Sequence, residues 1–180
     1  TKQRVAAGVV RLINEAYFRI GSDRYADENK TFGASTLQKR HVQDHGDRIV
    51  FDFIGKESVR QHQIVVDPAV TAFVRELLRT PGRRLFRYKT AEGTWANLTA
   101  RDVNEYLHDR LGVPYSAKDF RTWGGTLAAA TILSDIGPGK TPRETQKTLL
   151  TTIRLVAAEL GNTPTVCRKA YIHPIVVARY

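Results

Sequence analysis

One tyrosine near the C-terminal end has neighbours that could support nucleophilic chemistry. In the stretch LGNTPTVCRKAYIHP, residues 160–174, Tyr171 follows Arg168 and Lys169 and precedes His173. The phenol of a tyrosine has an ordinary pKa of about 10, and nearby cations favour its charged form. Tyr171 is one of seven tyrosines in the chain, and packing is the ordinary role of a tyrosine. The local sequence therefore leaves two interpretations open, a packing residue or a nucleophile.

A second stretch places two cations on one helical face. In SAKDFRTWGGTLAAA, residues 116–130, Lys118 and Arg121 lie about one turn apart if Ser116 caps a helix. The positive end of the helix dipole also favours an anion near this point. Guanidinium groups bind phosphate oxygens through paired N–H donors. The pattern indicates either a phosphate-binding face or a solvated basic face.

Three further polar residues lie where the chain turns or where a helix ends. Lys56 occupies the turn in FIGKESV, and Arg19 follows an apolar helix end in YFRIGS. Asn162 lies between Gly161, which can end one helix, and a Thr-Pro pair that can begin the next. Taken singly, each of these residues has an ordinary role as a solvated or capping side chain.

The composition indicates a polyanionic partner. The 180 residues include 28 Lys and Arg against 18 Asp and Glu, which gives a formal net charge of +10. A basic surface on a small domain favours nucleic acid as the partner. Cys167 is the single cysteine, so it excludes an intramolecular disulfide and a cysteine metal cluster and fits a reducing, intracellular location. No apolar run approaches the ~18 residues of a membrane span.

Two common kinds of catalytic motif are missing. The segment IGPGKT is similar to a phosphate-binding loop, but the position of the required first glycine is Ser134, and a helical pattern precedes it. We therefore interpret this segment as an interhelical loop. The histidines form no HExxH motif, and the carboxylates do not cluster as a metal-dependent nuclease requires. The sequence predicts neither a nucleotide site nor a metal site.

The periodicity of apolar residues predicts a mainly α fold with a small three-stranded antiparallel sheet. Between Leu37 and Val66, β-branched and aromatic runs are separated by DHGD and GKES, which indicates a three-stranded meander. The rest of the chain has a helical pattern, with capping signals at Asp67, Thr99 and Thr163. The expected helices cover residues 4–18, 68–79, 99–111, 116–134, 142–160 and 164–172. A chain of 180 residues fits one domain.

Considered as an ordered set, these residues resemble the catalytic domain of type IB DNA topoisomerases, in the small poxvirus-like bacterial branch. The resemblance covers nearly the whole chain and is carried by FRIGSDRYADENKTFGASTL, FIGKESV, KDFRTWGGT and CRKAYIHP. It implies the fold that these enzymes share with tyrosine recombinases. It also implies relaxation of supercoiled DNA by transient cleavage and religation of one strand.

The resemblance assigns a role to each member of the set. Tyr171 is expected to attack a DNA phosphodiester, forming a 3′-phosphotyrosyl bond and releasing a 5′-hydroxyl strand. Arg19 and Arg121 are expected to bind the non-bridging oxygens, and Lys56 to protonate the leaving 5′-oxygen. Asn162 stands where the family commonly has His; its amide can donate a hydrogen bond but cannot shuttle a proton in the working pH range.

The same resemblance supplies several further expectations. Lys118 and Tyr25 are expected to contact DNA phosphates, while Cys167 and His173 have structural roles. No cofactor, nucleotide, ATP or metal is expected, and the expected partner is double-stranded DNA, bound by a monomer that is cytoplasmic and nucleoid-associated. Residues 1–180 are expected to form the catalytic domain, without the smaller N-terminal domain that closes a clamp around DNA.

Two other functions remain as alternatives. Tyrosine recombinases and integrases have a similar tail pattern, LGH followed by Tyr, but they usually carry HxxR where this chain has the stretch from Lys118 to Arg121. A non-catalytic basic DNA-binding module would explain the net charge of +10. It would not explain the order in which Tyr171 and the other members of the set occur.

Overall fold

The computed structural model describes residues 1–180 and divides them into an N-terminal unit, residues 1–118, and a C-terminal unit, residues 119–180. The expected mainly helical fold with a small three-stranded antiparallel sheet is confirmed. The prediction of a single catalytic domain over the whole chain stays a prediction, and within that range the structure distinguishes the two units.

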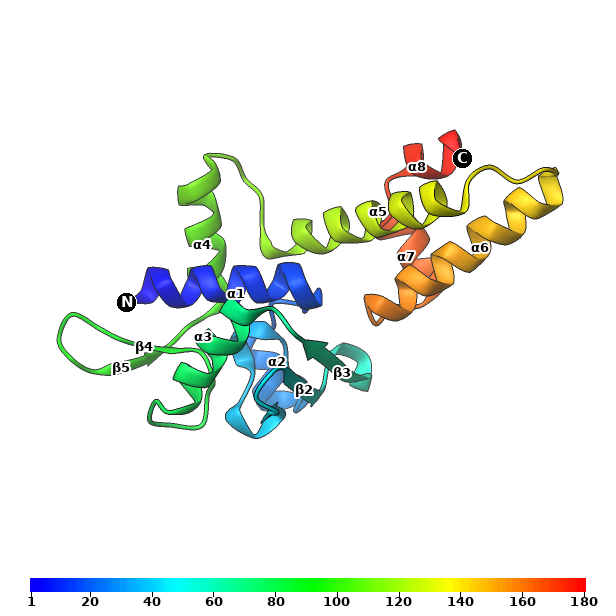
Figure 1. The fold of residues 1–180 in the computed structure, drawn as a ribbon. Coiled ribbons are helices and arrows are strands. Elements are labelled where there is room, and N and C mark those ends of the chain that lie inside the picture. The colour runs from blue at the N-terminus through cyan, green and yellow to red at the C-terminus, as the bar shows by residue number, and fades with distance from the viewer. The chain divides into compact units, whose positions relative to one another are not determined.

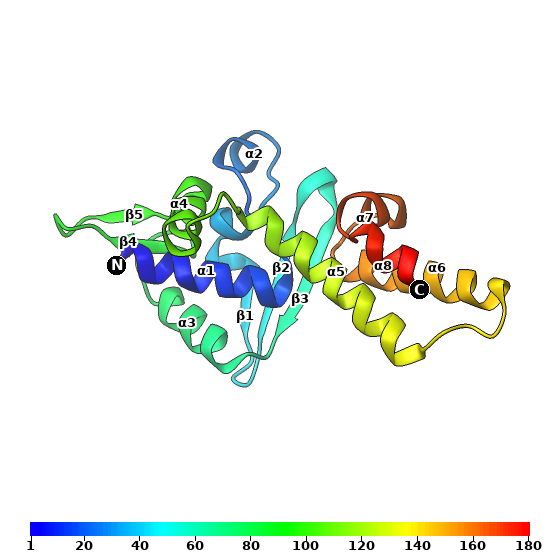
Figure 2. The same cartoon turned by 90° about the horizontal axis from the view of Figure 1, so that it is seen from above.

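Helix α1 (Lys2–Ala16) carries the central apolar stripe of the N-terminal unit. Its buried residues recur at helical spacing, and it contacts α3 (Pro68–Leu78) and α4 (Ala100–Leu111) (Figures 1 and 2). Gly8 allows α3 to approach closely, because a Cβ at this position would lie 2.2 Å from ring carbons of Phe73. The first helix is therefore the element on which the rest of the unit packs.

The predicted meander is present. Strands β1 (Val42–Asp44), β2 (Ile49–Ile54) and β3 (Arg60–Val65) form an antiparallel sheet in the order β1-β2-β3. On the buried face of β2, Phe51 and Phe53 each lie edge-on to Phe18, with ring centroids 5.2 Å apart. This aromatic cluster fixes the chain that leaves α1 against the sheet.

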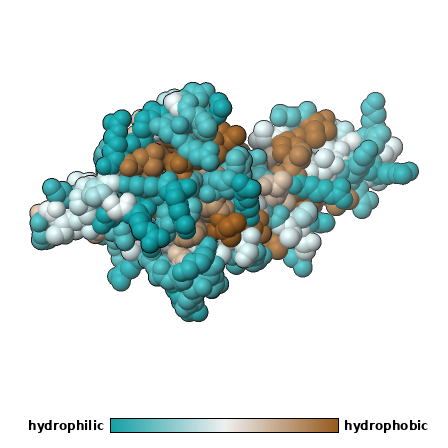
Figure 3. Space-filling model, turned by 90° about the horizontal axis from the view of Figure 1, so that it is seen from below, coloured by the Kyte–Doolittle hydropathy of each residue, from teal (hydrophilic) through white to brown (hydrophobic).

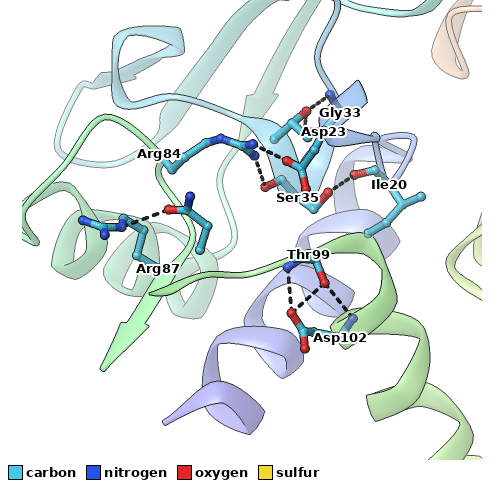
Figure 4. A network of polar contacts seen from close by, with 10 residues as sticks. Ile20, Asp23, Gly33, Ser35, Arg84, Arg87, Thr99 and Asp102 are labelled. Atoms are coloured by element: carbon cyan, nitrogen blue, oxygen red, sulfur yellow. Dashed lines mark hydrogen bonds and ion pairs between the residues drawn. The ribbon is translucent and has the colours of Figure 1, made fainter. Parts of the chain in front are cut away.

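Residues 87–97 lie between the expected helices 68–79 and 99–111, and no strand was predicted there. This segment forms a hairpin of β4 (Arg87–Lys89) and β5 (Trp95–Asn97). The Arg87 guanidinium holds the hairpin together. It donates to Asn97 Oδ1 at 3.0 Å (Figure 4), and it also donates to the Trp95 carbonyl at 3.1 Å. The long Arg87 side chain supplies cross-strand hydrogen bonds that the two three-residue strands lack. The alternation of apolar and polar residues in the sequence does not predict such bonds. Helix α2 (Asp23–Glu28) likewise lies outside the helices that the sequence predicted.

Capping residues set the helix boundaries as the sequence predicts. The Asp67 carboxylate accepts the Val70 N–H at the start of α3. Thr99 and Asp102 form a reciprocal capping box at the start of α4 (Figure 4). At the start of α5 (Ala117–Ile136), the Ala117 N–H donates to the Asn104 side chain at 3.0 Å. The capping role expected of Ser116 stays a prediction.

The C-terminal unit is entirely helical. Residues 119–136 of α5 are followed by α6 (Pro142–Glu159), α7 (Pro164–Ala170) and α8 (Pro174–Arg179), with α7 packed on α6 (Figure 2). The IGPGKT segment is the loop between α5 and α6, as expected. Thr163 caps α7 by accepting the Val166 N–H. Helix α7 ends before the predicted residue 172, so Tyr171 is its C-cap residue.

The face drawn in Figure 3 is largely hydrophilic and carries separate hydrophobic patches. None of the helices combines the length and hydropathy that crossing a bilayer requires.

The buried imidazole of His41 should make stability depend on pH. His41 is 8% exposed and lies against Phe32, and burial together with the Arg40 charge lowers its pKa to about 4, while Asp52 opposes this effect. Below the ordinary pKa of about 6.5, the unfolded chain binds a proton here that the folded chain does not. The free energy of unfolding should therefore fall by up to about 3 kcal/mol between pH 6.5 and pH 4.

Urea unfolding across this pH range measures the effect. His41→Asn, which retains a hydrogen-bond acceptor, should flatten the dependence, whereas His45→Asn at an exposed site should retain it. Carboxylates with lowered pKa values, among them Asp44, Asp52 and Glu76, add to the same trend near the acidic end of this range. The difference between the His41→Asn and His45→Asn slopes therefore isolates the buried imidazole. An unchanged slope in His41→Asn would contradict the assignment.

Candidate active site

Three of the expected site residues line one cavity in the N-terminal unit. Arg19, Tyr25 and Lys56 surround a volume of about 470 Å³, together with Phe32 and other residues of the segments that carry them. They come from the chain after α1, from α2 and from the β2–β3 connection. The structure thus brings together residues that are up to 37 positions apart in the sequence.

Arg19 is positioned through its backbone. Phe18 anchors the segment in the core, and the Arg19 carbonyl accepts the Ala34 N–H at 2.7 Å. The next carbonyl, that of Ile20, accepts both the N–H and the hydroxyl of Ser35, at 2.7 and 2.8 Å (Figure 4). Three hydrogen bonds therefore join this segment to residues 34–35.

Gly33 permits this close pairing. A Cβ at Gly33 would lie 2.5 Å from both the Arg19 carbonyl oxygen and the Gly21 nitrogen, which is far inside van der Waals contact. The Gly33 N–H donates to the Thr36 hydroxyl at 2.9 Å (Figure 4). Gly33 had no predicted role, because the contact that requires glycine is made with a segment more than ten residues earlier in the chain.

Tyr25 lies on the short helix α2 and is 54% exposed. An ion pair between Asp23 and Arg84 holds this helix, and the same guanidinium donates to the Ser35 carbonyl at 3.1 Å (Figure 4). The Arg24 guanidinium lies 5.8 Å from the centre of the Tyr25 ring. An exposed phenol beside a cation is suited to contact a phosphate.

Lys56 lies at the tip of the β2–β3 hairpin, as predicted. The Gly55 N–H donates to the Val59 carbonyl at 2.8 Å and closes the turn, in which Glu57 and Ser58 have φ values of 62° and 59°. The Lys56 ammonium is exposed and lies 3.9 Å from the Glu57 carboxylate. The tight turn fixes the backbone while the long side chain extends into solvent.

The C-terminal unit brings Arg121, Asn162 and Tyr171 together. The Arg121 guanidinium carbon lies 5.2 Å from the centre of the Tyr171 ring, and the arginine is only 3% exposed. The guanidinium donates to the Leu160 carbonyl at 2.7 Å, and the Asn162 amide reaches the same oxygen at 3.5 Å. The Leu160 carbonyl at the end of α6 thus accepts hydrogen bonds from two members of this cluster, Arg121 and Asn162.

A second group of contacts fixes the backbone of Tyr171 against α5. The Thr126 hydroxyl donates to the Tyr171 carbonyl at 3.2 Å and accepts the His173 N–H at 3.0 Å. A Cβ at Gly125 would lie 2.8 Å from the same carbonyl oxygen. Gly125 and Thr126 belong to the stretch KDFRTWGGT but had no predicted role. Their position four and five residues after Arg121 was the only feature of the sequence that pointed to them.

Cys167 and His173, which were expected to have structural roles, make contacts of a structural kind. Cys167 is buried at 0% exposure, and its carbonyl accepts the Tyr171 N–H at 3.0 Å. Burial raises the pKa of its thiol, and the Arg121 charge opposes this effect. His173 caps α8, where its Nδ1 accepts the Ile175 N–H at 3.3 Å.

Lys118 and Arg121 fall in different units although they belong to one short motif. Lys118 is the last residue of the N-terminal unit and is exposed, whereas Arg121 is buried in the C-terminal unit. The structure therefore describes two clusters, one with Arg19, Tyr25 and Lys56 and one with Arg121, Asn162 and Tyr171.

Comparison with known proteins identifies the family. The family model described as "Eukaryotic DNA topoisomerase I, catalytic core" matches residues 1–180. The chain belongs to this family. The match favours a topoisomerase over the recombinase alternative, because the whole chain fits the topoisomerase core.

Individual relatives agree with this family. The chain is 27% identical to "DNA topoisomerase 1B" of Acanthamoeba polyphaga mimivirus, over 95% of this chain and 53% of that protein. It is 28% identical to "DNA topoisomerase 1B" of Vaccinia virus (strain Copenhagen), over 96% of this chain and 52% of the relative. It is 30% identical to "DNA topoisomerase 1" of Schizosaccharomyces pombe, over 72% of this chain and 15% of that protein.

The chain therefore spans about half the length of its viral relatives. These relatives come from viruses and a yeast, so the bacterial placement stays a prediction.

The close approach at Gly33 predicts a large effect of one methyl group. Gly33→Ala should lower the free energy of unfolding by about 3 kcal/mol, because the new Cβ meets backbone atoms that cannot move independently. Gly46→Ala is the control, since a Cβ there meets nothing within 4 Å and only the positive φ of 87° opposes it, at about 1 kcal/mol. Urea unfolding compares the two variants. Equal stability of Gly33→Ala and the unmodified chain would contradict the backbone pairing at Arg19.

Proposed function

We propose that this chain relaxes supercoiled DNA by cleaving one strand through Tyr171 and rejoining it, without ATP or metal. The observation that carries the proposal is the Arg121 guanidinium, buried and 5.2 Å from the centre of the Tyr171 ring, in a member of the topoisomerase catalytic-core family. A buried cation beside one particular phenol gives that tyrosine a chemical environment that a packing residue does not need.

The cleavage step follows from this arrangement. The Tyr171 oxygen attacks the phosphorus of a DNA phosphodiester, a bond forms to the 3′-phosphate, and the bond from phosphorus to the 5′-oxygen breaks. The phenol must release its proton to solvent before or during attack, and it takes a proton back when it departs during religation. The same guanidinium can bind the non-bridging oxygens, on which negative charge accumulates in the transition state. Its bond to the Leu160 carbonyl fixes its orientation in advance.

The cluster in the N-terminal unit supplies the complementary groups in this proposal. Lys56 donates a proton to the departing 5′-oxygen, and Arg19 provides a second guanidinium for the phosphate. Lys118 and Tyr25 bind neighbouring phosphates. For religation the 5′-hydroxyl gives its proton to Lys56 and attacks phosphorus, and Tyr171 departs. The phosphotyrosyl bond retains the energy of the original phosphodiester, so no nucleotide is needed.

Asn162 has a narrower role than the histidine common in the family. Its amide can donate a hydrogen bond to a phosphate oxygen but carries no titratable proton near neutral pH. It ends α6 together with Gly161, whose φ of 60° turns the chain toward α7. We assign Asn162 to transition-state hydrogen bonding rather than to proton transfer.

The remaining expectations belong to the same proposal. The chain has the catalytic-domain fold that type IB topoisomerases share with tyrosine recombinases, acts on double-stranded DNA as a monomer and works at the nucleoid. The net charge of +10 supports a partner with a phosphate backbone.

The proposed chemistry predicts plasmid relaxation in EDTA without ATP. At low salt, the chain should produce a ladder of relaxed topoisomers, and Tyr171→Phe should abolish it because the attacking oxygen is gone. Tyr106→Phe removes a hydroxyl outside both clusters and should relax DNA normally. Relaxation by Tyr171→Phe at the unmodified rate would refute the nucleophile assignment. A folded, DNA-binding chain that relaxes no plasmid would favour the non-catalytic module.

The contacts of Thr126 predict that it positions the nucleophile. Thr126→Val keeps the shape of the side chain but loses both hydrogen bonds to the Tyr171 segment, so formation of the covalent adduct should slow by about tenfold. Thr126→Ser retains the hydroxyl and should recover most of the rate. Single-turnover cleavage of a nicked oligonucleotide duplex measures this step, and DNA affinity should stay unchanged. Equal cleavage rates for the Val and Ser variants would contradict the positioning role.

A further inference from the structure

A second cavity in the N-terminal unit lies outside the proposed catalytic clusters. Its volume is about 1140 Å³, and Phe32 is the only residue that it shares with the cavity lined by Arg19 and Lys56. The charged side chains on its wall are mostly cationic. They are Lys30, Arg40, Arg60, Arg83 and Arg84, against Asp27 and Asp52.

Part of this positive charge is neutralised within the protein. Arg60 binds Asp52 through both carboxylate oxygens, at 2.8 and 2.5 Å, and Arg84 binds Asp23. Three other cations, Lys30, Arg40 and Arg83, have no carboxylate within ion-pair distance. The cationic side chains that line the cavity therefore outnumber the carboxylates that neutralise them. The resulting positive potential attracts anions.

Gln38 and His41 also line this cavity and carry neutral hydrogen-bonding groups. The His41 Nδ1 accepts the Gln38 N–H at 3.1 Å, so the neutral imidazole carries its proton on Nε2 as a donor. The Gln38 Oε1 is inaccessible to solvent and has no hydrogen-bond partner in the protein. A buried acceptor without a donor is costly, and a bound water or the N–H or O–H of a ligand would satisfy it.

We infer that this cavity binds a phosphate group, with Lys30, Arg40 and Arg83 as the cations and His41 as a neutral donor. Phosphate suits the site because guanidinium groups pair with its oxygens and an imidazole N–H can add a directed bond. The phosphate can belong to a free small molecule or to the backbone of DNA. The inference concerns binding alone and does not depend on cleavage by Tyr171.

Titration with inorganic pyrophosphate at constant ionic strength tests the inference. The NMR signals of the His41 imidazole should shift and saturate, and Arg40→Gln with Arg83→Gln should weaken binding at least tenfold. Both side chains are exposed, so these changes should leave the fold intact. The control pair Arg79→Gln with Arg143→Gln makes the same change in net charge away from the cavity and should bind pyrophosphate normally.

A short DNA duplex distinguishes the two sources of phosphate. If DNA is the source, the duplex should displace pyrophosphate, and the Arg40 and Arg83 changes should lower the slope of log affinity against log salt by about 2. If a free small molecule is the source, duplex and pyrophosphate should bind together. Either result supports a phosphate site. A shift that never saturates, or equal weakening by both pairs of variants, would overturn the inference.

Discussion

The packing of the C-terminal unit depends on how the buried guanidinium of Arg121 is stabilised. Burying a charged group is costly unless hydrogen bonds and neighbouring charges compensate. Arg121 is compensated by the carbonyl that ends α6 and by the face of the Tyr171 ring, 5.2 Å away. These two partners come from different helices, so α5, the end of α6 and the end of α7 must meet at one point. A phosphate that reached this point would bring negative charge to the guanidinium and could accept its N–H donors.

Close backbone contacts hold the functional residues on both units. Gly33 lets the Arg19 segment pair with residues 34–35, and Gly125 lets the Tyr171 carbonyl rest against α5. In each case a hydroxyl next to the glycine contact completes the hydrogen bonding, that of Ser35 in the first and of Thr126 in the second. Rigid backbone support of this kind orients catalytic side chains before substrate arrives.

Local signals in the sequence predicted much of the fold and part of the site. The caps at Asp67 and Thr163 and the meander around Phe51 rest on neighbouring residues, and the structure confirms them. The β4–β5 hairpin was missed because the Arg87 side chain, rather than strand periodicity, holds it. The supports of Tyr171 were not predictable, since Gly125 and Thr126 act on a segment 45 residues away.

The central claim is that Tyr171 joins the 3′-phosphate of a cleaved DNA strand. The most direct test traps the covalent adduct on a duplex whose short 5′-hydroxyl fragment diffuses away, digests it with protease and identifies the DNA-linked peptide by mass spectrometry. The account predicts one linked peptide, with the 3′-phosphate on Tyr171. A linkage through another residue, or to a 5′-phosphate, would contradict it.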